Sequence, residues 1–351
     1  MKFSTERICS FMRIGLLGVG AIGGVIGGYL ARAGEEVTLV DTWPENIERI
    51  KSNGLKVTSV EEEFITFPVA LHIGELSATQ PKFDVLILSV KSDDTSWTVK
   101  FIEPYLAEGG FIVSAQNSIN EFRIAEEIGW TRVMGCVVTI GASLYEPGNP
   151  CRTSTVSRPA FVLGEPSGMI TPRLESMVEV MGPVGITKTT TNLWGQRWAK
   201  LGTNCMANAL AAVSGLTSFE LRNDPVAGEI AVKLVAEVIQ VAMSLGVHVE
   251  DINGQVPASY LDAVESPGSM NLLREALIEQ GRSLGEGRPS LAQDVMKGRK
   301  TEIEHLNGYV ISKGIELGVS TPVNVALYRI AKELEAGEID PSPKNLRFID
   351  L

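Results

Sequence analysis

One stretch of the sequence places a lysine and two asparagines on the same side of a helix. Lys200, Asn204 and Asn208 recur every four residues in the run WAKLGTNCMANAL, whose spacing is helical. A lysine here could donate a proton to a carbonyl oxygen, and the amides could hold a substrate hydroxyl. A solvated polar stripe is the alternative, although asparagines among Leu, Met and Ala need hydrogen-bond partners if they are buried.

A second set of polar residues lies in SLAQDVMKGRKTEIEHLNG, where Ser290, Asp294, Arg299 and Glu302 follow one another closely. These types could bind a polar substrate or orient a proton donor. Taken by itself, this segment favours a structural interpretation, in which Ser290 caps a helix with Asp294 in its solvated first turn. Glu302 precedes apolar residues at core spacing, which favours a place on the solvated side.

The segment Gly18-Val19-Gly20-Ala21-Ile22-Gly23 has the spacing of a dinucleotide-binding turn. It follows an apolar strand and opens a helix, which is the context that this motif requires. Gly18 allows the tight turn, Gly20 lets the backbone approach a pyrophosphate, and Gly23 permits close packing of the helix on the strand. The helix N-terminus at Ala21 and Ile22 supplies N–H groups and a partial positive charge. A purely structural glycine turn is the alternative.

Asp41 ends the second strand of this unit, 21 residues beyond Gly20. A carboxylate there would accept hydrogen bonds from the adenosine ribose hydroxyls and repel a 2′-phosphate. The next basic residue is Arg49, so the sequence predicts NADH or NAD in preference to NADPH. A solvated turn aspartate remains the alternative.

Alternating strands and helices must position these residues. The apolar runs predict strands, and periodic segments predict helices: strands at 13–17, 36–40, 83–90, 111–114 and 132–138, a helix at 21–33, and later helices at 194–214, 226–245, 270–279, 290–317 and 322–334. The fold class is therefore α/β, a Rossmann-type doubly wound parallel sheet followed by a mostly α-helical C-terminal domain. We expect a dinucleotide-binding domain at 12–190, with 141–190 finishing the sheet, and a helical catalytic domain at 191–351.

Composition excludes several other classes. The 351 residues carry a formal net charge of −11 and no basic run, which argues against nucleic-acid binding. Four scattered cysteines and three histidines predict neither a metal site nor a disulfide framework, and they suit a reducing cytoplasm. The uncharged stretch 14–30 is too short and too rich in glycine for a membrane span. The first eleven residues match no pattern and are expected to be a loose extension.

Taken in order, several motifs resemble the ketopantoate reductase (2-dehydropantoate 2-reductase) family over residues 12–335: RIGLLGVGAIGGVIGGYLARAGEEVTLV, SVKSDDT, AQN at 115–117, WAKLGTNCMANAL, RPSLAQDVMKGRKTEIEHLNG and GVSTPVN. The resemblance implies reduction of a 2-keto acid to a D-2-hydroxy acid by hydride from a nicotinamide, as in pantothenate biosynthesis. It implies that Lys200 is the general acid and that Glu302 orients this lysine or the new hydroxyl. It further implies roles for the polar residues nearby: Asn204, Asn208 and Ser290 would bind the substrate, and Lys91 and Asn117 would line the nicotinamide side of the site. Lys200 is then expected to have a lowered pKa.

Two departures from the family pattern leave the substrate open. Most members have a basic residue after the second strand, where this chain has Asp41-Thr42-Trp43-Pro44, and a glycine after the asparagine that corresponds to Asn117, where it has Ser118. Ketopantoate is the leading substrate, and an NAD-dependent D-2-hydroxyacid dehydrogenase of the D-mandelate type is the alternative. A non-catalytic NAD-sensing protein is an alternative of a different class, which the presence of Lys200 and Glu302 disfavours. The long apolar helices are compatible with a homodimer.

Overall fold

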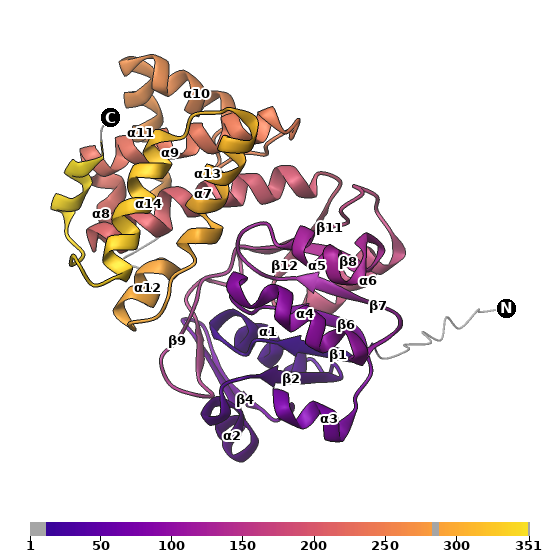
Figure 1. The fold of residues 1–351 in the computed structure, drawn as a ribbon. Helices are drawn as coiled ribbons and strands as arrows, with labels where there is room; N and C mark the ends of the chain where they lie inside the picture. The colour runs from indigo at the N-terminus through magenta and orange to yellow at the C-terminus, as the bar shows by residue number, and fades with distance from the viewer. Residues whose placement is uncertain (1–11, 283–287, 350–351) are drawn as a thin grey trace. The chain divides into compact units, whose positions relative to one another are not determined.

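The computed structural model describes residues 12–282 and 288–349, and in it the chain divides into two compact units (Figure 1). The first unit comprises the chain up to residue 116 together with residues 120–191. The second comprises residues 117–119 and the chain from residue 192 onward. The initial extension expected from the sequence, which includes Cys9, lies outside the described residues.

An eight-stranded sheet forms the centre of the first unit, in the order β12-β11-β8-β7-β6-β1-β2-β5. Its strands are β1 (Ile14–Leu17), β2 (Val37–Asp41), β5 (Val69–His72), β6 (Phe83–Leu88), β7 (Leu106–Ser114), β8 (Val133–Val138), β11 (Pro159–Gly164) and β12 (Ile186–Thr190). Six neighbouring strands are parallel, and β11 and β12 run in the opposite direction. The expected parallel sheet is confirmed, as is its completion by the segment 141–190.

A smaller sheet that the sequence analysis did not predict has the order β4-β3-β10-β9. Its members are β3 (Leu55–Ser59), β4 (Glu63–Thr66), β9 (Ala142–Leu144) and β10 (Pro150–Arg152). They are short, and β4 alternates exposed and half-buried residues, so each carries little of the apolar signal by which strands are recognised.

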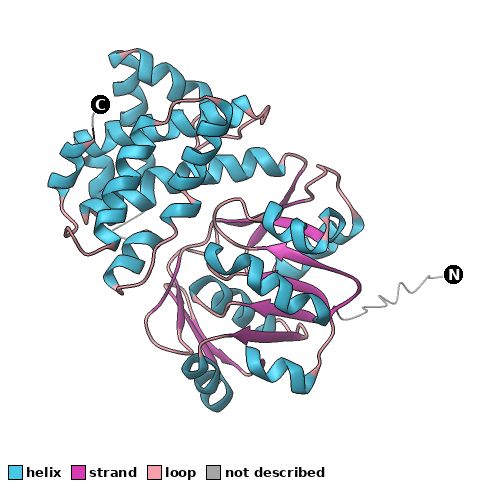
Figure 2. Ribbon diagram, in the orientation of Figure 1, coloured by secondary structure: helices cyan, strands magenta, loops and turns pink. Residues whose placement is uncertain are grey.

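Helices cover both faces of the large sheet (Figure 2). Residues of α1 (Ala21–Arg32) and α6 (Pro172–Met181) share one apolar core with the sheet. Residues of α3 (Leu76–Thr79), α4 (Thr95–Ile102) and α5 (Glu121–Ile128) share a second core. Strands β1 and β6 are largely buried on both faces, which explains why their residues are apolar except for Asp84 in β6. A further helix, α2 (Pro44–Asn53), follows β2.

Strand register brings the functional positions of this unit together. Leu17, the last residue of β1, pairs with Val40 on one side and Leu88 on the other. The segments that follow these three strands therefore emerge at the same edge, which is where ligands bind in open α/β sheets.

The second unit is helical, as expected. It consists of α7 (Leu193–Ser214), α8 (Ser218–Asn223), α9 (Pro225–Ser244), α10 (Pro257–Glu265), α11 (Pro267–Gly281), α12 (Ser290–Met296), α13 (Asn307–Leu317) and α14 (Pro322–Glu335). Helices α7 and α9 supply much of a single apolar core. No described helix is both long enough and apolar enough to cross a membrane.

The expected single helix over 290–317 is wrong. The chain instead forms α12, a 3₁₀ turn (Ile303–His305) and α13. Gly298 has φ +61°, in the left-handed region that ends a helix, and Lys297 donates its N–H to the carbonyls at the end of α12. Glu302 consequently lies in a non-helical segment between two helices.

Candidate active site

Two glycines of the turn 18–23 are required by packing within the protein. Gly18 has φ +88°, and a Cβ at this position would lie 2.7 Å from the backbone nitrogen of Val90. A Cβ on Gly23 would lie 2.0 Å from the carbonyl oxygen of Gly18 and 2.4 Å from Oγ of Ser89. Ser89 donates its hydroxyl to the Gly18 carbonyl at 2.7 Å. The end of β6 therefore holds the turn against the start of α1.

Gly20 is different, because no packing contact among the described residues requires a glycine there. It precedes α1 with φ −75°, which any residue adopts, and a Cβ built on it meets no atom within 4 Å. Neither a capping side chain nor an acidic first-turn residue occupies this end of α1, where Ala21 and Ile22 begin the helix. The open space and the uncapped N–H groups fit a pyrophosphate, which would approach the backbone where a side chain would obstruct it.

The structure places Asp41 beside the glycine-rich turn. Its Oδ2 accepts the N–H of Val19 at 2.6 Å, and its Oδ1 accepts the N–H of Trp43 at 3.0 Å. Asn46 also contacts the glycine-rich turn, where its side-chain amide donates to the Val19 carbonyl at 2.9 Å. Since each carboxylate oxygen can accept more than one hydrogen bond, these contacts orient Asp41 and leave acceptor capacity for a ligand hydroxyl.

Sequence reasoning missed His72 in this corner. Strand β5 pairs His72 with Asp41, and the Nε2 atom of His72 lies 3.3 Å from the carbonyl of Thr42. Its Nδ1 accepts the N–H of Gly74 at 3.2 Å. The only sequence signal was the parallel strand itself, whose partner cannot be deduced from local pattern.

Lys91 begins the 3₁₀ turn Ser92–Asp94 and is exposed. The preceding residue, Val90, accepts a hydrogen bond from the amide of Gln116 at 2.9 Å, and the same amide donates to Thr95 at 2.9 Å. Gln116, which the sequence analysis did not single out, thus fixes the segment after β6 to the end of β7.

In the second unit, three asparagines and a serine form a continuous set of hydrogen bonds, which we term the amide chain. Asn204 donates to Oδ1 of Asn117 at 3.3 Å, and Asn208 donates to Oδ1 of Asn204 at 3.1 Å. Ser290 donates its hydroxyl to Oδ1 of Asn208 at 3.0 Å. The stripe of asparagines on α7 is therefore buried and partnered, which rules out the solvated alternative for these residues.

Lys200 lies one helical turn before Asn204 on α7 and is half-buried. Burial lowers the pKa of its ammonium group from the ordinary value of 10.5. Desolvation disfavours the charged form, so this lysine releases its proton more readily than a solvated one. The direction agrees with the expectation for a proton donor.

The structural interpretation of the 290–302 segment is wrong at each position it addressed. Pro289, not Ser290, caps α12, and Asp294 is only 5% exposed. Glu302 is 4% exposed, not solvated. Thr301 beside it donates its N–H and its hydroxyl to Glu335 of α14, at 2.9 and 2.6 Å. Arg299, by contrast, is exposed.

The backbone at Ser118 explains why a glycine would suit this position. Its φ is +67°, a left-handed conformation that favours glycine. The buried Ser118 hydroxyl donates to the carbonyl of His305, just beyond Glu302. The two hydrogen bonds made by Asn117 and Ser118 attach residues 117–119 to the second unit.

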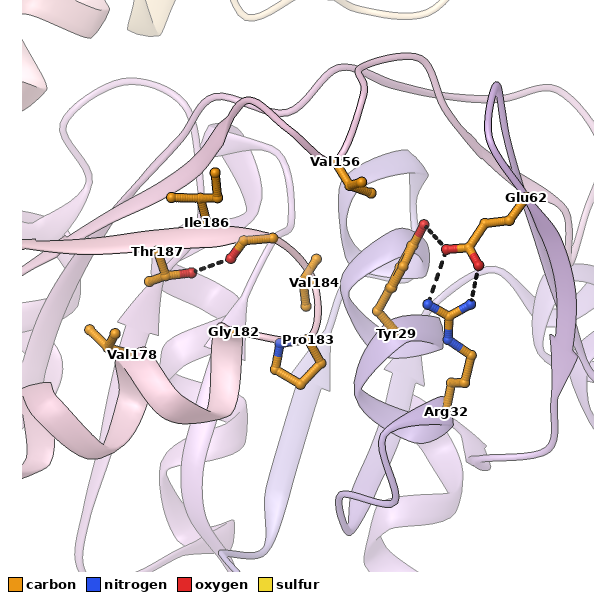
Figure 3. Close-up of a pocket in the computed structure, with 11 residues that line it drawn as sticks. Tyr29, Arg32, Glu62, Val156, Val178, Gly182, Pro183, Val184, Ile186 and Thr187 are labelled. Atoms are coloured by element: carbon orange, nitrogen blue, oxygen red, sulfur yellow. Dashed lines mark hydrogen bonds and ion pairs between the residues drawn. The ribbon is translucent and has the colours of Figure 1, made fainter.

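A pocket in the first unit lies away from the glycine-rich turn. It has a volume of about 550 Å³ and is lined by Tyr29, Arg32 and Glu62 on one side and by the segment 182–187 on another (Figure 3). Glu62 accepts hydrogen bonds from Tyr29 at 2.9 Å and from Arg32 at 2.6 Å. Tyr29 is about 14 Å along the helix axis from Gly20, so this pocket is separate from the open space beside Gly20.

Family models match both parts of the chain. Residues 14–166 match "Ketopantoate reductase PanE/ApbA", and residues 192–335 match its C-terminal model. The 2-dehydropantoate 2-reductase of Aquifex aeolicus is 30% identical over 328 residues, which cover 92% of this chain and 97% of that protein. The enzyme of the same name from Pyrococcus horikoshii is 30% identical, with 93% and 98% covered.

Solved structures agree in fold. The PanE/ApbA family ketopantoate reductase of Ralstonia eutropha has a TM-score of 0.76 at 26% identity, covering 93% of this chain and 99% of that one. A D-mandelate dehydrogenase in complex with NADH and anilino(oxo)acetate has a TM-score of 0.78 at 21% identity, with the same coverage.

Proposed function

The chain belongs to the ketopantoate reductase family, and on that basis we propose that it reduces 2-dehydropantoate to a D-2-hydroxy acid with NADH. At the coarser level it is an oxidoreductase that acts on CH–OH groups with NAD(P). The proposal concerns the substrate, the preferred cofactor and the residues that act.

The amide chain is the observation that carries the proposal. Buried asparagines are costly unless each polar atom has a partner, and here the partners are other polar side chains together with the backbone N–H of Leu291, which donates to Oδ1 of Asn208 at 3.4 Å. Such a fixed row of amides and one hydroxyl suits the carboxylate and hydroxyl groups of a small 2-keto acid. We assign Asn204, Asn208 and Ser290 to substrate binding, and Asn117 to the nicotinamide side.

Lys200 is assigned as the general acid. When hydride reaches the carbonyl carbon, negative charge develops on the ketone oxygen, and a nearby ammonium group can neutralise it by donating a proton. The lowered pKa of Lys200 supports this role. Glu302 is assigned as the residue that orients Lys200 or the new hydroxyl, because a buried carboxylate acts as a hydrogen-bond acceptor.

The cofactor assignment rests on the first unit. A bound nicotinamide dinucleotide supplies the hydride. Gly18 and Gly23 let the turn pack closely against the end of β6, and Gly20 leaves room for the pyrophosphate at the N-terminus of α1, next to the N–H groups of Ala21 and Ile22. Asp41 would accept hydrogen bonds from the adenosine ribose and repel a 2′-phosphate, and Lys91 would contribute beside the nicotinamide.

A second candidate substrate is an aromatic or branched 2-keto acid, handled by an NAD-dependent D-2-hydroxyacid dehydrogenase. Asp41 favours this candidate, because it predicts the cofactor that the D-mandelate dehydrogenase complexes contain. A homodimer is also part of the proposal. Leu272 on α11 and Ile315 on α13 are largely exposed, and a similar structure from Staphylococcus aureus is described as dimeric.

The deciding experiment is an initial-rate panel of 2-dehydropantoate, benzoylformate and 2-ketoisovalerate, each with NADH and with NADPH. We expect the highest kcat/KM for 2-dehydropantoate with NADH. The highest value for benzoylformate would favour the second candidate, and a strong preference for NADPH would contradict the role of Asp41.

A Lys200→Met variant tests the assigned acid. We expect kcat to fall by about two to four orders of magnitude, the usual contribution of a positioned proton donor. Lys344→Met, at an exposed position of the same unit, is the matched control and should retain normal rates. Near-normal turnover by Lys200→Met would remove the lysine from the mechanism.

A further inference from the structure

The buried Glu302 lies in a segment that helix α14 contacts on both sides of this residue. Before it, Thr301 donates its N–H and its hydroxyl to Oε1 of Glu335, at 2.9 and 2.6 Å. After it, Glu304 accepts the hydroxyl of Tyr328 at 2.5 Å. Tyr328 and Glu335 are seven residues apart on α14, so they lie on one side of this helix and about 10 Å apart along its axis. One face of α14 therefore attaches the chain both before and after Glu302.

Hydrogen bonds within the segment fix the backbone at Glu302 itself. The Thr301 hydroxyl, whose proton is donated to Glu335, accepts the N–H of Ile303 at 3.2 Å. The Glu302 carbonyl accepts the N–H of His305 at 2.9 Å. Because only 3% of Thr301 is exposed, water is a poor substitute for Glu335 as the acceptor of its two donors. The direction of the Thr301 hydroxyl, and with it the bond from Ile303, therefore depends on the carboxylate of Glu335.

Glu335 occupies a position where a carboxylate is otherwise unfavourable. It is the last residue of α14, and the C-terminal end of a helix carries a partial negative charge. Its side chain is 12% exposed, and its Oε2 pairs with Lys332 at 2.6 Å. Burial alone would raise the pKa of this carboxyl, but the hydrogen bonds from Lys332 and Thr301 hold the pKa below its usual range. Glu335 is therefore an ionised acceptor that uses one oxygen for Thr301 and the other for Lys332.

We propose that Glu335 is a positioning residue for the reduction, which acts through Thr301 to hold Glu302 in place. This inference rests on the role proposed for Glu302, the orientation of Lys200 or of the new hydroxyl. Glu302 lies between two helices and not inside one, so its position depends on tertiary hydrogen bonds of this kind. A displacement of about 1 Å in a positioned group can lower a rate by about 100-fold. The effect should appear in kcat, because the residues assigned to substrate binding lie on α7 and at the start of α12.

Substitutions at Glu335 test the proposal, with rates measured for the substrate and cofactor that give the highest kcat/KM. Glu335→Leu removes both acceptor oxygens, and we expect kcat to fall by about 10- to 100-fold with little change in either KM. Glu335→Gln keeps one oxygen that can accept from Thr301, and it should restore a nearly normal kcat. Lys332→Met removes only the partner of Oε2 and is the matched control, for which we expect a normal kcat. A normal kcat in Glu335→Leu, or an equal loss in Glu335→Gln, would overturn the proposal.

A double-mutant cycle with Glu302 separates positioning from a general effect on the fold. The loss of kcat caused by Glu335→Leu should largely disappear in the Glu302→Ala background, because the group to be positioned is then absent. Additive losses would show that Glu335 acts independently of Glu302, against the proposal. A normal kcat in Glu302→Ala alone would remove the role proposed for Glu302. A reduced kcat in Glu302→Ala together with a normal kcat in Glu335→Leu would refute only the positioning.

Thr301 provides the same test if Glu335→Leu does not fold. Thr301→Val keeps the shape of the side chain and removes the hydroxyl, whereas Thr301→Ser keeps the hydroxyl. We expect kcat to fall by about tenfold in Thr301→Val and to stay near normal in Thr301→Ser, with Tm values that show both variants to be folded at the assay temperature. Equal kcat values in the two variants would contradict the proposal.

Discussion

Ser118 offers a test of how the segment after β7 is held in place. Its φ of +67° is unfavourable for any residue with a Cβ, by about 1–2 kcal/mol. Its hydroxyl offsets this by donating to the His305 carbonyl within the second unit. Substitution by glycine removes both features, and substitution by alanine removes only the hydrogen bond.

An alanine variant is ordinarily more stable than the glycine variant at the same position, and at position 118 this order should be reversed. Both lose a buried hydrogen bond, which costs about 1 kcal/mol. Ser118→Gly also relieves the backbone strain, while it adds about 0.5–1 kcal/mol of chain entropy to the unfolded state. On balance Ser118→Gly should be more stable than Ser118→Ala by about 0.5–1 kcal/mol.

Urea unfolding followed by circular dichroism at 222 nm measures this difference, since that signal reports mainly on helix. Ser214, buried in the last turn of α7 with its hydroxyl bonded to the Leu210 carbonyl, is the matched control. There the order should reverse, because alanine is favoured over glycine in a helix by about 1 kcal/mol. If Ser118→Ala proved as stable as Ser118→Gly, the strain argument would be refuted.

Four further outcomes follow from the sites. Asn208→Leu should raise KM for the keto acid by about tenfold, since it removes polar contacts worth about 1.4 kcal/mol, and should change KM for NADH little. An unchanged KM for the keto acid would argue against contact between Asn208 and the substrate. In pH–rate profiles, kcat/KM for reduction should decline above a pKa lower than 10.5, because Lys200 must be protonated to donate; a flat profile up to that pH would contradict the assignment. Asp41→Asn should shift the preference toward NADPH by about tenfold or more, measured as a ratio of kcat/KM values. Burial works against ionisation of Glu165, but its bonds to Arg173 and Thr171 hold the pKa of its carboxyl below the usual range. The ionised carboxylate therefore stabilises the fold at neutral pH, and this contribution is lost as the pH falls through the folded-state pKa. Glu165→Gln should unfold at a lower urea concentration at pH 7, and its stability should fall less on acidification than that of the wild-type chain.

The large sheet was predictable because its central strands are recognisable in the sequence as apolar runs. FDVLIL in β6 is apolar except for Asp84, and such a run bounded by turns is typical of a strand covered on both faces. The small sheet was not predictable, because β9 and β10 have three residues each and pair with segments about 90 residues away or across a short loop. Pairing over such a separation leaves no local pattern to read.

The candidate site also has features that the sequence predicts and features that depend on tertiary structure. The spacing of Lys200, Asn204 and Asn208 on one face followed directly from helical geometry. Their burial did not, because it depends on Ser290 and Asn117 arriving from distant parts of the chain. The local sequence likewise favoured a solvated position for Glu302, whereas tertiary packing buries this residue.

Asp41 combines a structural contact with an expected role in cofactor binding. Its carboxylate accepts the N–H of Val19 inside the glycine-rich turn and the N–H of Trp43 before α2. The same group therefore shapes the turn and presents negative charge where the adenosine ribose is expected. Removing its charge and removing its acceptor atoms are different perturbations, because the first acts on the 2′-phosphate and the second leaves a backbone donor without a partner. An alanine at this position would remove the charge and both acceptors, whereas an asparagine removes the charge and keeps one acceptor, so that only one of the two backbone N–H groups loses its partner.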